Sequence, residues 1–389
     1  MKKKNFREAA EMVYLDNSAT SLKKPLTVFE AVNDCMMNYG ANPGRASHHL
    51  AKKLQEKVYE AREDISSFFN IPNPQRLIFT FNATDALSTA ILGFLSEGDH
   101  VITSPMEHNS VLRPLYFLKS KGVESDICSA DVYGRVRWKD IEKCIKPNTA
   151  LCVLIHASNV CGTVNDIREI GYELKKRNII FLVDASQSAG ATEIDVLRDN
   201  VDILAFSGHK ALMGPQGTGG LYVREGIDLR PLRFGGTGSY SLDISQPSEY
   251  PDRLESGTLN GWGIVGLAEG VKFIKHTGIH NISSYERQLT GRCLENLSVI
   301  KNLSITGYMS TVSRLGVISF TSPKMNPDAI GGILDKEYGI AVRSGYHCAP
   351  LSHKILGTED GGTVRISIGC FNTMHEIDYV SKALSDILR

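Results

Sequence analysis

One lysine in the sequence has the surroundings that a covalent aldehyde site needs. Lys210 closes the segment Ser207-Gly208-His209-Lys210, which directly follows the apolar run 201–206 and precedes the glycine-rich stretch 214–220. Such a run is typical of a buried strand, so Lys210 is expected at a strand end. Its amine could form a Schiff base with an aldehyde, while Ser207 and His209 could hold an attached phosphate. The alternative is a polar corner with a solvated lysine, and the tetrapeptide alone does not decide between them.

A carboxylate follows a neighbouring apolar run. Asp184 comes directly after residues 179–183, and Gln187 follows it three residues later. A carboxylate in this place can pair with a protonated pyridine nitrogen and keep the ring an electron sink. Aspartate is also a common helix N-cap. Because Asp184 and Lys210 follow successive strands of one predicted sheet, the pair favours the ring.

Two more runs end in residues that could contact a ring. His108 follows the strand predicted near 101–104 and could lie flat against an aromatic ring or move protons, although a loop histidine is more often structural. Asn159 follows residues 151–155, where its amide could bond a ring hydroxyl. Both residues are therefore candidates for the same site.

A phosphate could bind where the next helix begins. Asn82-Ala83-Thr84-Asp85 follows the run 77–81 and opens a helix. Backbone N–H groups at such a start, together with the Thr84 hydroxyl, would suit a phosphate, and plain capping is the alternative. Strand after strand thus ends in polar residues on the same side of the predicted sheet.

A second candidate segment carries a thiol. Cys348 lies in Arg343-Ser344-Gly345-Tyr346-His347-Cys348-Ala349-Pro350, next to a histidine and five residues after an arginine. Nearby cationic groups lower a thiol's pKa, and the polar, bend-prone setting argues against an inert buried cysteine. Arg365, within the predicted strand 363–368, could clamp an amino-acid carboxylate or could simply face water.

These residues need an α/β scaffold to bring them together. The runs 77–81, 101–103, 151–155 and 179–183 lack polar alternation, which is typical of a parallel sheet covered on both faces. Residues 167–176 have apolar positions at helical spacing. Ligands of such sheets bind beyond the carboxyl ends of the strands, where Lys210 falls.

The flanking regions predict helices and a smaller α+β unit. An amphipathic helix is expected over 50–68, and further helices near 263–275, 283–297 and from Thr373, where Glu376 completes a capping box. Strands are expected at 316–320 and 363–368. We therefore predict a large α/β domain over residues 16–261, and a small domain made of 1–15 and 262–389.

Composition narrows the class of protein. The 389 residues include 43 Lys and Arg and 43 Asp and Glu, so no net field attracts nucleic acid or an anionic membrane. No secretory signal and no apolar run of membrane-spanning length occurs, which predicts a soluble cytoplasmic protein without a membrane partner. Eight cysteines without a Cys-x-x-Cys pair indicate reduced, mostly buried thiols, with neither a disulfide framework nor a metal site.

The motifs together carry a family resemblance. Asp184-x-x-Gln187, Ser207-x-His209-Lys210 and the glycine stretch resemble the class V branch of fold-type I pyridoxal-phosphate enzymes. Within it, the similarity is to cysteine desulfurases and selenocysteine lyases, and it runs from Tyr14 to Thr373. It implies a large α/β domain with a mostly parallel sheet of the seven-stranded type and a smaller α+β domain that carries the Cys348 loop. The segment from Arg343 to Pro350 is similar to the desulfurase signature of the second, Suf-type group, whose cysteine lies on a short, fairly ordered loop.

The resemblance implies a role for each matching residue, with pyridoxal 5'-phosphate as the cofactor. Lys210 would hold it covalently, Asp184 would pair with its ring nitrogen, Gln187 and Asn159 with the ring oxygen, and His108 would cover the ring and act in catalysis. The phosphate would be bound by Thr84, Ser207, His209 and the segment at Ala83, where a hydroxyl of the commoner pattern is missing. Thr258 of a second subunit would join them, although Leu259 stands where proline is usual, and this contact implies a homodimer. The substrate would be bound by Arg365, with contributions from Arg343, Asn17 and His48.

The implied reaction turns L-cysteine into L-alanine and leaves a persulfide on Cys348 for a thiol or an acceptor protein. A selenocysteine lyase acting on L-selenocysteine is one alternative. A class V aminotransferase or lyase that does not use Cys348 is another. A non-catalytic sulfur-relay or scaffold subunit is a third, against which Lys210, Asp184 and Cys348 together argue.

Overall fold

The computed structural model describes residues 12–44, 48–239 and 242–389. Residues 1–11 of the predicted small domain lie outside the described residues. So do residues 45–47 of the segment 42–48, which we predict to lie near the substrate.

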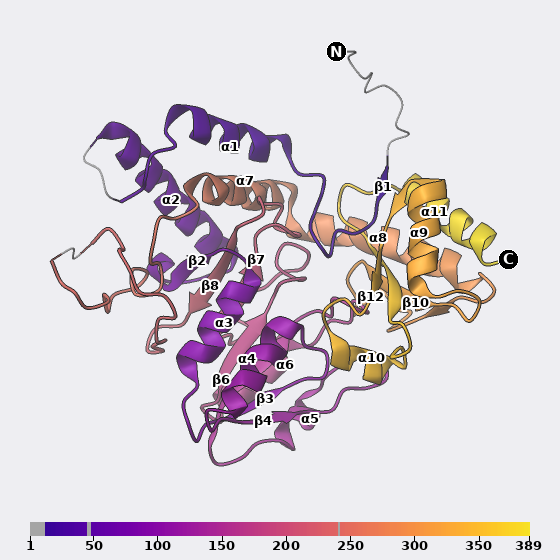
Figure 1. The fold of residues 1–389 in the computed structure, drawn as a ribbon, viewed down its shortest axis with the longest axis horizontal. Coiled ribbons are helices and arrows are strands. Elements are labelled where there is room, and N and C mark those ends of the chain that lie inside the picture. The colour runs from indigo at the N-terminus through magenta and orange to yellow at the C-terminus, as the bar shows by residue number, and fades with distance from the viewer. Residues whose placement is uncertain (1–11, 45–47, 240–241) are drawn as a thin grey trace.

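A seven-stranded sheet forms the centre of the molecule (Figure 1). Its strand order is β2-β8-β7-β6-β5-β3-β4. Only β8 runs antiparallel to its neighbours, and the remaining pairs are parallel, so the predicted mostly parallel α/β sheet is confirmed. The strands are β2 (Leu77–Thr80), β3 (His100–Thr103), β4 (Glu124–Ile127), β5 (Thr149–Ile155), β6 (Ile180–Asp184), β7 (Ile203–Ser207) and β8 (Gly219–Val223).

Glycine makes room for β8 between its neighbours. A Cβ atom on Gly220 would lie 2.2 Å from the ring of Phe206 on β7, and one on Gly219 would lie 2.8 Å from the backbone of Asn82. Both contacts are far below van der Waals distance, so no larger residue fits without displacement. The glycine stretch after Lys210 therefore continues into a buried strand.

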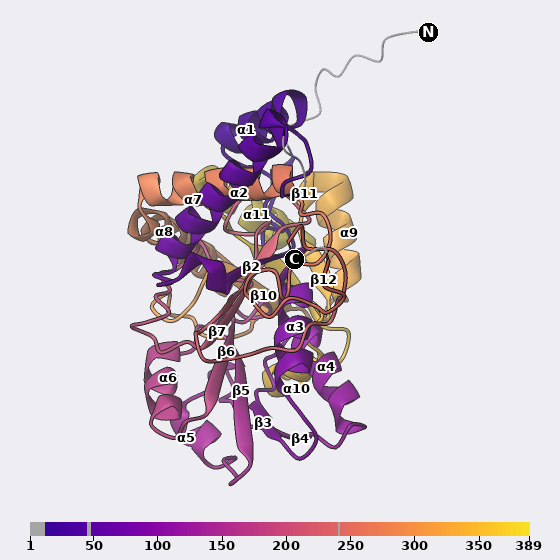
Figure 2. The ribbon, with the colours of Figure 1, turned by 90° about the vertical axis from the view of Figure 1, so that its left-hand side faces the viewer.

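Helices cover both faces of this sheet, as the parallel strands require (Figure 2). On one face lie α3 (Ala83–Phe94) and α4 (Asn109–Lys119), and on the other α5 (Trp138–Glu142) and α6 (Ile167–Lys175). A short 3₁₀ helix, Pro74–Arg76, precedes β2. Each face has its own apolar core, and the core on the α6 side also takes in the next group of helices.

That group consists of α1 (Leu26–Asn38), α2 (His49–Phe68) and α7 (Gly261–Thr277). Ile65 of α2 and Leu267 of α7 are fully buried in the same core as Phe206 of β7. The amphipathic helix predicted over 50–68 is confirmed as α2, because its apolar stripe is the buried one.

A smaller unit is built around an antiparallel sheet of order β12-β13-β10-β9, at the right of Figure 1. A parallel pair, β1 with β11, lies beside it. Its strands are β1 (Val13–Tyr14), β9 (Ser304–Ile305), β10 (Val317–Thr321), β11 (Ile340–Ala341), β12 (Arg343–Gly345) and β13 (Thr363–Ser367). Its helices are α8 (Ile279–Ser298), α9 (Pro327–Tyr338), α10 (Pro350–Leu356) and α11 (Met374–Ile387). The predicted capping box of Thr373 and Glu376 is present at the start of α11.

The two units meet near residues 261–279. The apolar residues of α7 pack into the large core, whereas Leu289 of α8 packs with Leu15 and Phe320 in the small one. The predicted boundary at 261/262 assigns α7 to the small domain, whereas its apolar residues pack into the core of the large unit. The boundary itself remains a prediction.

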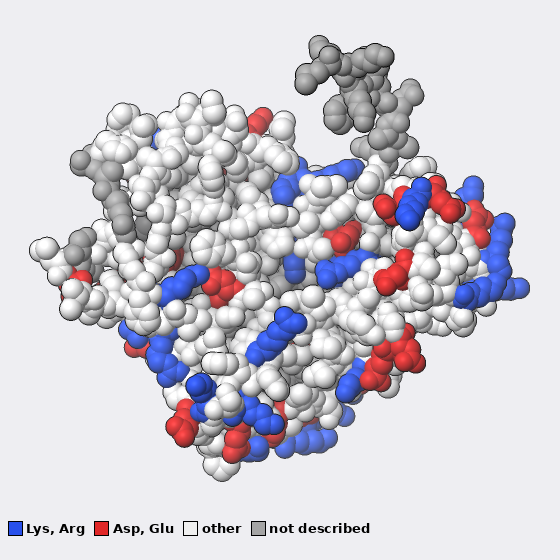
Figure 3. All heavy atoms as spheres, viewed as in Figure 1, with Lys and Arg blue, Asp and Glu red and all other residues white. Residues whose placement is uncertain are grey.

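Charged side chains of both signs are interspersed over the face shown in Figure 3. Within the described ranges, no helix combines the length and the apolar character needed to cross a bilayer.

Candidate active site

A cavity of about 290 Å³ opens at the carboxyl ends of β5, β6 and β7. The sheet brings the residues that follow these strands to one place, as predicted. The cavity is lined by Ser18, Ala19, Asn82, Ala83, Thr84, His108, Ser110, Ile155, Asn159, Asp184, Ser186, Gln187, Ser207, His209, Lys210, Arg343, His347 and Arg365.

Lys210 and Asp184 place an amine and a carboxylate in the cavity. Burial lowers the pKa of the Lys210 amine to about 8, and the Asp184 carboxylate acts in the opposite direction. Asp184 ends β6 and is 1% exposed. Its Oδ1 accepts a hydrogen bond from the Ser186 N–H at 2.8 Å and another from the Ser186 hydroxyl. A buried carboxylate held this way is suited to face a cationic ring nitrogen.

His108 caps α4 and is held in one tautomer. Its Nδ1 accepts from the backbone N–H of Ser110 at 3.0 Å and lies 2.8 Å from the Ser110 hydroxyl. Since Nδ1 accepts, the proton of the neutral ring is on Nε2. Burial lowers the pKa of His108, with Asp184 opposing this effect. The neutral ring can therefore lie over an aromatic group and exchange a proton through Nε2.

The start of α3 forms the polar end of the cavity. Asn82 is the N-cap, and its Oδ1 accepts from the Asp85 N–H at 2.9 Å. The Thr84 hydroxyl lies 2.7 Å from that of Ser110. The N–H groups of a first helical turn have no partner inside the helix, so this end suits an anion.

His209 and Ser207 complete that end from β7. Nδ1 of His209 lies 3.0 Å from the Thr20 hydroxyl. Burial, followed by the charges of Lys210 and Lys24, lowers the pKa of His209 to about 4. The imidazole is thus neutral at physiological pH and can offer a hydrogen bond to a phosphate rather than a charge.

The two side-chain amides of the cavity differ in their contacts. Gln187 Nε2 donates to the carbonyl of Ser18 at 3.1 Å. Asn159 Nδ2 donates to the carbonyl of His347 at 2.6 Å, and its Oδ1 is buried without a hydrogen-bond partner among the described residues.

Pyridoxal phosphate fits this set of groups. The side-chain amides of Asn159 and Gln187 line the cavity, where a ring oxygen could bind, and the buried carboxylate of Asp184 suits a pyridinium. The α3 N-terminus suits the phosphate, and Lys210 supplies the amine for the aldehyde.

Cys348 lies beside this cavity, on the segment between β12 and α10. Its thiol is exposed, and Nη2 of Arg343 lies 3.7 Å from Sγ. Arg343 and the neighbouring His347 line the cavity. The thiol thus has the cationic neighbour that the sequence predicted, and it is accessible from outside.

Arg365, on β13, is 1% exposed. Its Nη2 donates to Oδ1 of Asp16 at 2.8 Å and its Nη1 to the carbonyl of Asn159 at 3.0 Å. Nε has no hydrogen-bond partner in the described part of the chain. The guanidinium is therefore fixed from two sides and keeps capacity for a carboxylate.

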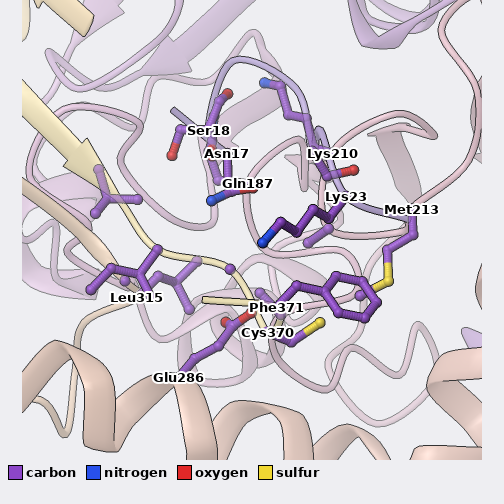
Figure 4. A pocket seen from close by; sticks show the side chains of 17 residues that line it. Asn17, Ser18, Lys23, Gln187, Lys210, Met213, Glu286, Leu315, Cys370 and Phe371 are labelled. Carbon is purple, nitrogen blue, oxygen red and sulfur yellow. The ribbon is translucent and has the colours of Figure 1, made fainter. Parts of the chain in front are cut away.

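Besides Cys348, three predicted residues do not line this cavity. Thr258 borders a different cavity, and its hydroxyl lies 3.4 Å from Asn42 Nδ2. His48 is the exposed N-cap of α2, where its Nδ1 accepts from the Ala51 N–H. Asn17 borders an adjoining cavity (Figure 4), and its amide donates to the carbonyl of Ser367 at 2.9 Å.

Sequence reasoning missed several residues of the site. Ser110 contacts both His108 and Thr84, and Ser186 holds Asp184. Glu107 is fully buried beside Ile155, and burial raises its pKa to about 8. The spacing of Ser110 behind His108 is an ordinary helix-start pattern, so it gave no signal of its own.

Seven cysteines other than Cys348 are free thiols, of which five are buried. Burial raises the pKa of Cys152 and Cys293, which keeps both protonated and unreactive. This confirms the prediction that the thiols are mostly buried.

Comparison with known proteins gives a consistent family. Residues 13–380 match the family described as aminotransferase class-V. A probable cysteine desulfurase of Pyrococcus abyssi is 37% identical over 387 residues, which are 97% of this chain and 95% of the relative. A cysteine desulfurase of Salmonella newport is 31% identical over 97% of this chain and 94% of its own length. The solved apo cysteine desulfurase of Thermococcus onnurineus NA1 superposes with a TM-score of 0.91 at 35% identity, covering 97% of this chain and 95% of that one. The chain therefore belongs to the aminotransferase class-V family, and within it to the cysteine desulfurases.

Proposed function

We propose that this chain is a pyridoxal-phosphate-dependent enzyme that converts L-cysteine into L-alanine and leaves the sulfur as a persulfide on Cys348. One observation carries the proposal. A single cavity combines a partly buried lysine and a buried carboxylate with two arginines, and an exposed thiol lies 3.7 Å from one of those arginines.

Different residues of the cavity would bind different parts of the cofactor. Lys210 would hold the aldehyde carbon, Asp184 the ring nitrogen, and Asn159 with Gln187 the ring oxygen. Thr84, Ser207, His209 and the N–H groups from Ala83 onward would hold the phosphate. When bound, the cofactor supplies an electron sink that makes bonds at the substrate Cα and Cβ labile.

Lys210 and His108 are the groups that move protons. With a pKa of about 8, the Lys210 amine is neutral in roughly a tenth of the molecules at neutral pH, so it can accept the Cα proton. His108 presents its Nε2 proton to the cavity and can pass a proton to or from the substrate.

Arg365 and Arg343 orient the substrate and the thiol. Arg365, fixed by Asp16 and the Asn159 carbonyl, would bind the carboxylate of the amino acid. Arg343, whose Nη2 lies 3.7 Å from Sγ of Cys348, can orient the thiol. The thiolate attacks the substrate sulfur and forms an S–S bond, while the C–S bond breaks. The electron pair of the C–S bond stays with Cβ of the substrate, which gains a proton. The product then leaves as alanine.

The finer assignments follow from the same residues. The short, ordered Cys348 segment supports membership in the Suf-type group, and its exposed thiol supports transfer to an acceptor protein. Thr258 lies outside the cofactor cavity of its own chain, which supports a homodimer in which it reaches the phosphate of the second subunit. Asn17 and His48 would contribute around the substrate, and the eight cysteines without a Cys-x-x-Cys pair support a cytoplasmic location.

The test compares the purified wild type with Cys348→Ala. With L-cysteine, we expect the wild type to produce alanine and sulfide in the presence of a thiol and the variant to lose both. Cys144→Ala, which removes a partly exposed thiol elsewhere, serves as the matched control and should behave as the wild type. A purified wild type without the yellow cofactor band would refute the cofactor assignment. Normal turnover by Cys348→Ala would refute the nucleophile, and alanine from L-selenocysteine alone would indicate a lyase.

A further inference from the structure

Glu107 lies in the turn between β3 and α4 and is the residue directly before His108. It is 0% exposed. Its Oε1 accepts a hydrogen bond from the Ser104 hydroxyl at 2.5 Å and a second one from the backbone N–H of Ile155 at 3.0 Å. The proposed reaction uses His108 but assigns no part to this buried carboxyl group.

The contact with Ile155 satisfies a backbone group that β3 leaves without a partner. β3 ends at Thr103, whereas the neighbouring strand β5 continues to Ile155. The N–H of the next residue, His156, bonds to the carbonyl of Asp184 on β6. Because successive N–H groups of a strand point to opposite sides, the N–H of Ile155 points toward β3, which has already ended. A buried N–H without a partner is costly, so the carboxyl group of Glu107 takes the place of a strand residue here.

Ser104 closes the turn from within. Its hydroxyl donates to Oε1 of Glu107 and accepts from the backbone N–H of Met106 at 3.1 Å. Glu107 therefore fixes the turn internally through Ser104 and ties it to β5 through Ile155. Since His108 follows directly and is the N-cap of α4, the same anchor determines where the His108 ring lies.

The segment that carries Cys348 is docked on this turn. The carbonyl of Pro105 accepts from the Ser352 hydroxyl of α10 at 3.4 Å, and the N–H of Asn109 donates to the carbonyl of Cys348 at 2.8 Å. Met106 packs against apolar residues at the end of α10, which lies beside α4 in Figure 1. A displaced turn would therefore shift the thiol as well as the imidazole.

The carboxyl group of Glu107 is suited to this place as a neutral acid. Its Oε2 is buried and has no hydrogen-bond partner within the described ranges. An ion with an unpaired buried oxygen would be poorly compensated, and the Asp184 carboxylate disfavours a second negative charge. Burial raises the pKa of Glu107 to about 8, so the group is mostly protonated at neutral pH. It therefore offers Oε1 as an acceptor and adds little charge.

We propose that Glu107 is a positioning residue, which acts through Oε1 as a hydrogen-bond acceptor and not as a charge. By fixing the turn between β3 and α4, it aligns both His108 and the Cys348 segment with the cofactor cavity. The roles of His108 and Cys348 rest on the proposed function, whereas the anchoring of the turn does not.

Two variants separate the acceptor from the charge. Glu107→Gln keeps an oxygen for both donors, whereas Glu107→Met has a similar length and no such oxygen. Hydrogen exchange in the full-length apoprotein reports the anchor at the Ile155 amide and the docked segment at the Asn109 amide, because these are the two donors. The Cys152 amide in the centre of β5 reports global unfolding. Ile170→Ala, which removes a fully buried side chain of α6, is the control for a general loss of stability.

Relative to the Cys152 amide, we expect exchange at Ile155 and Asn109 to rise about tenfold or more in Glu107→Met. It should stay within about twofold of the wild type in Glu107→Gln and in Ile170→Ala. With cofactor and L-cysteine, Glu107→Met should lower kcat by about tenfold or more at an unchanged KM, because the arginines that bind the substrate are not on this turn. Glu107→Gln should have the rate of the wild type.

Ser104→Ala is a milder second variant in case Glu107→Met does not fold, and it should raise relative exchange at Ile155 and Asn109 in the same direction. Unchanged relative exchange in the folded variants would refute the anchor, and a rise at Ile155 without one at Asn109 would refute the link to the Cys348 segment. If Glu107→Gln behaves like Glu107→Met, the carboxyl group acts through its charge and the proposal is wrong. Normal turnover by Glu107→Met despite faster exchange would overturn the positioning role. A wild type that makes no alanine from L-cysteine would overturn the proposed function and leave the anchor intact, since the exchange experiment involves neither cofactor nor substrate.

Discussion

Glu286 makes a large and measurable contribution to the pH dependence of stability. This residue of α8 is 8% exposed and borders the small cavity of about 50 Å³ shown in Figure 4, beside Cys370. Burial raises its pKa from an ordinary 4.5 to about 8, and the hydrogen bond from the Cys370 N–H opposes the rise only in part. Lys23, across the cavity, pairs with Glu376 at 3.8 Å.

The sign follows from proton binding. Between about pH 4.5 and pH 8 the folded state keeps a proton on Glu286 that the unfolded state releases, so rising pH favours unfolding. The contribution to stability is fully present below the unfolded pKa and is lost as pH rises to the folded pKa. One proton corresponds to about 1.4 kcal/mol per pH unit. Glu286→Gln removes this titration, so its unfolding free energy relative to wild type should rise by about 3 kcal/mol between about pH 5 and pH 7.5.

Urea unfolding of the apoprotein at a series of pH values tests this expectation. The exposed Glu295 of the same helix gives a matched control, since Glu295→Gln removes a glutamate of α8 that is not buried. We expect Glu295→Gln to run parallel to the wild type at every pH. If Glu286→Gln also runs parallel to it, Glu286 titrates like an exposed carboxyl and the reasoning from burial is wrong.

Further expectations concern the site itself. Lys210→Ala should abolish the absorption band of the bound cofactor, and in the wild type the rate at which the band forms on adding pyridoxal phosphate should rise about tenfold per pH unit up to about pH 8, because only the neutral amine reacts. Cys348→Ser should keep the band but lower sulfide release by about 100-fold or more. A serine hydroxyl is not ionised at neutral pH and is therefore a poor nucleophile. Arg365→Lys should lower kcat/KM for L-cysteine by about 100-fold, because an ammonium cannot bind Asp16 and a carboxylate with the planar geometry of a guanidinium.

The sequence predicted the buried strands of the large sheet but missed two of its members. β5, β6 and β7 are continuous apolar runs, which can be recognised in the sequence as buried strands. The β4 strand Glu124–Ile127 is polar and mostly exposed because it lies at the sheet edge, so no apolar run marks it. β8 begins with Gly219 and Gly220, which are there to let Phe206 and Asn82 approach, and two glycines at the start of a strand resemble a loop.

Most of the residues that line the cavity could be predicted from the sequence, but the contacts between them could not. The ends of parallel strands meet at one edge of a sheet, so Asp184, Asn159 and Lys210 were expected to be neighbours. The contact between Asn159 and the His347 carbonyl joins positions 188 residues apart. No local pattern encodes it, because it depends on how the small unit lies against the large one.

Cys348, the proposed nucleophile, lies outside the apolar clusters. Polar contacts join its segment to the cavity, whereas Ile355 and Leu356 of the following helix α10 pack against Met106 and Ile155. Asn159 binds the His347 carbonyl through its side chain and Arg365 through its own carbonyl, and Asn109 binds Cys348. Each hydrogen bond is worth about 1 kcal/mol net, so a few of them fix the segment without making it permanent. In the proposed reaction the thiol first reaches a substrate in the cavity and then meets an acceptor outside, and this sequence needs such a balance. A continuous apolar core beneath Cys348 would hold the segment through many packed contacts at once, and it could not release the thiol by breaking two or three polar ones.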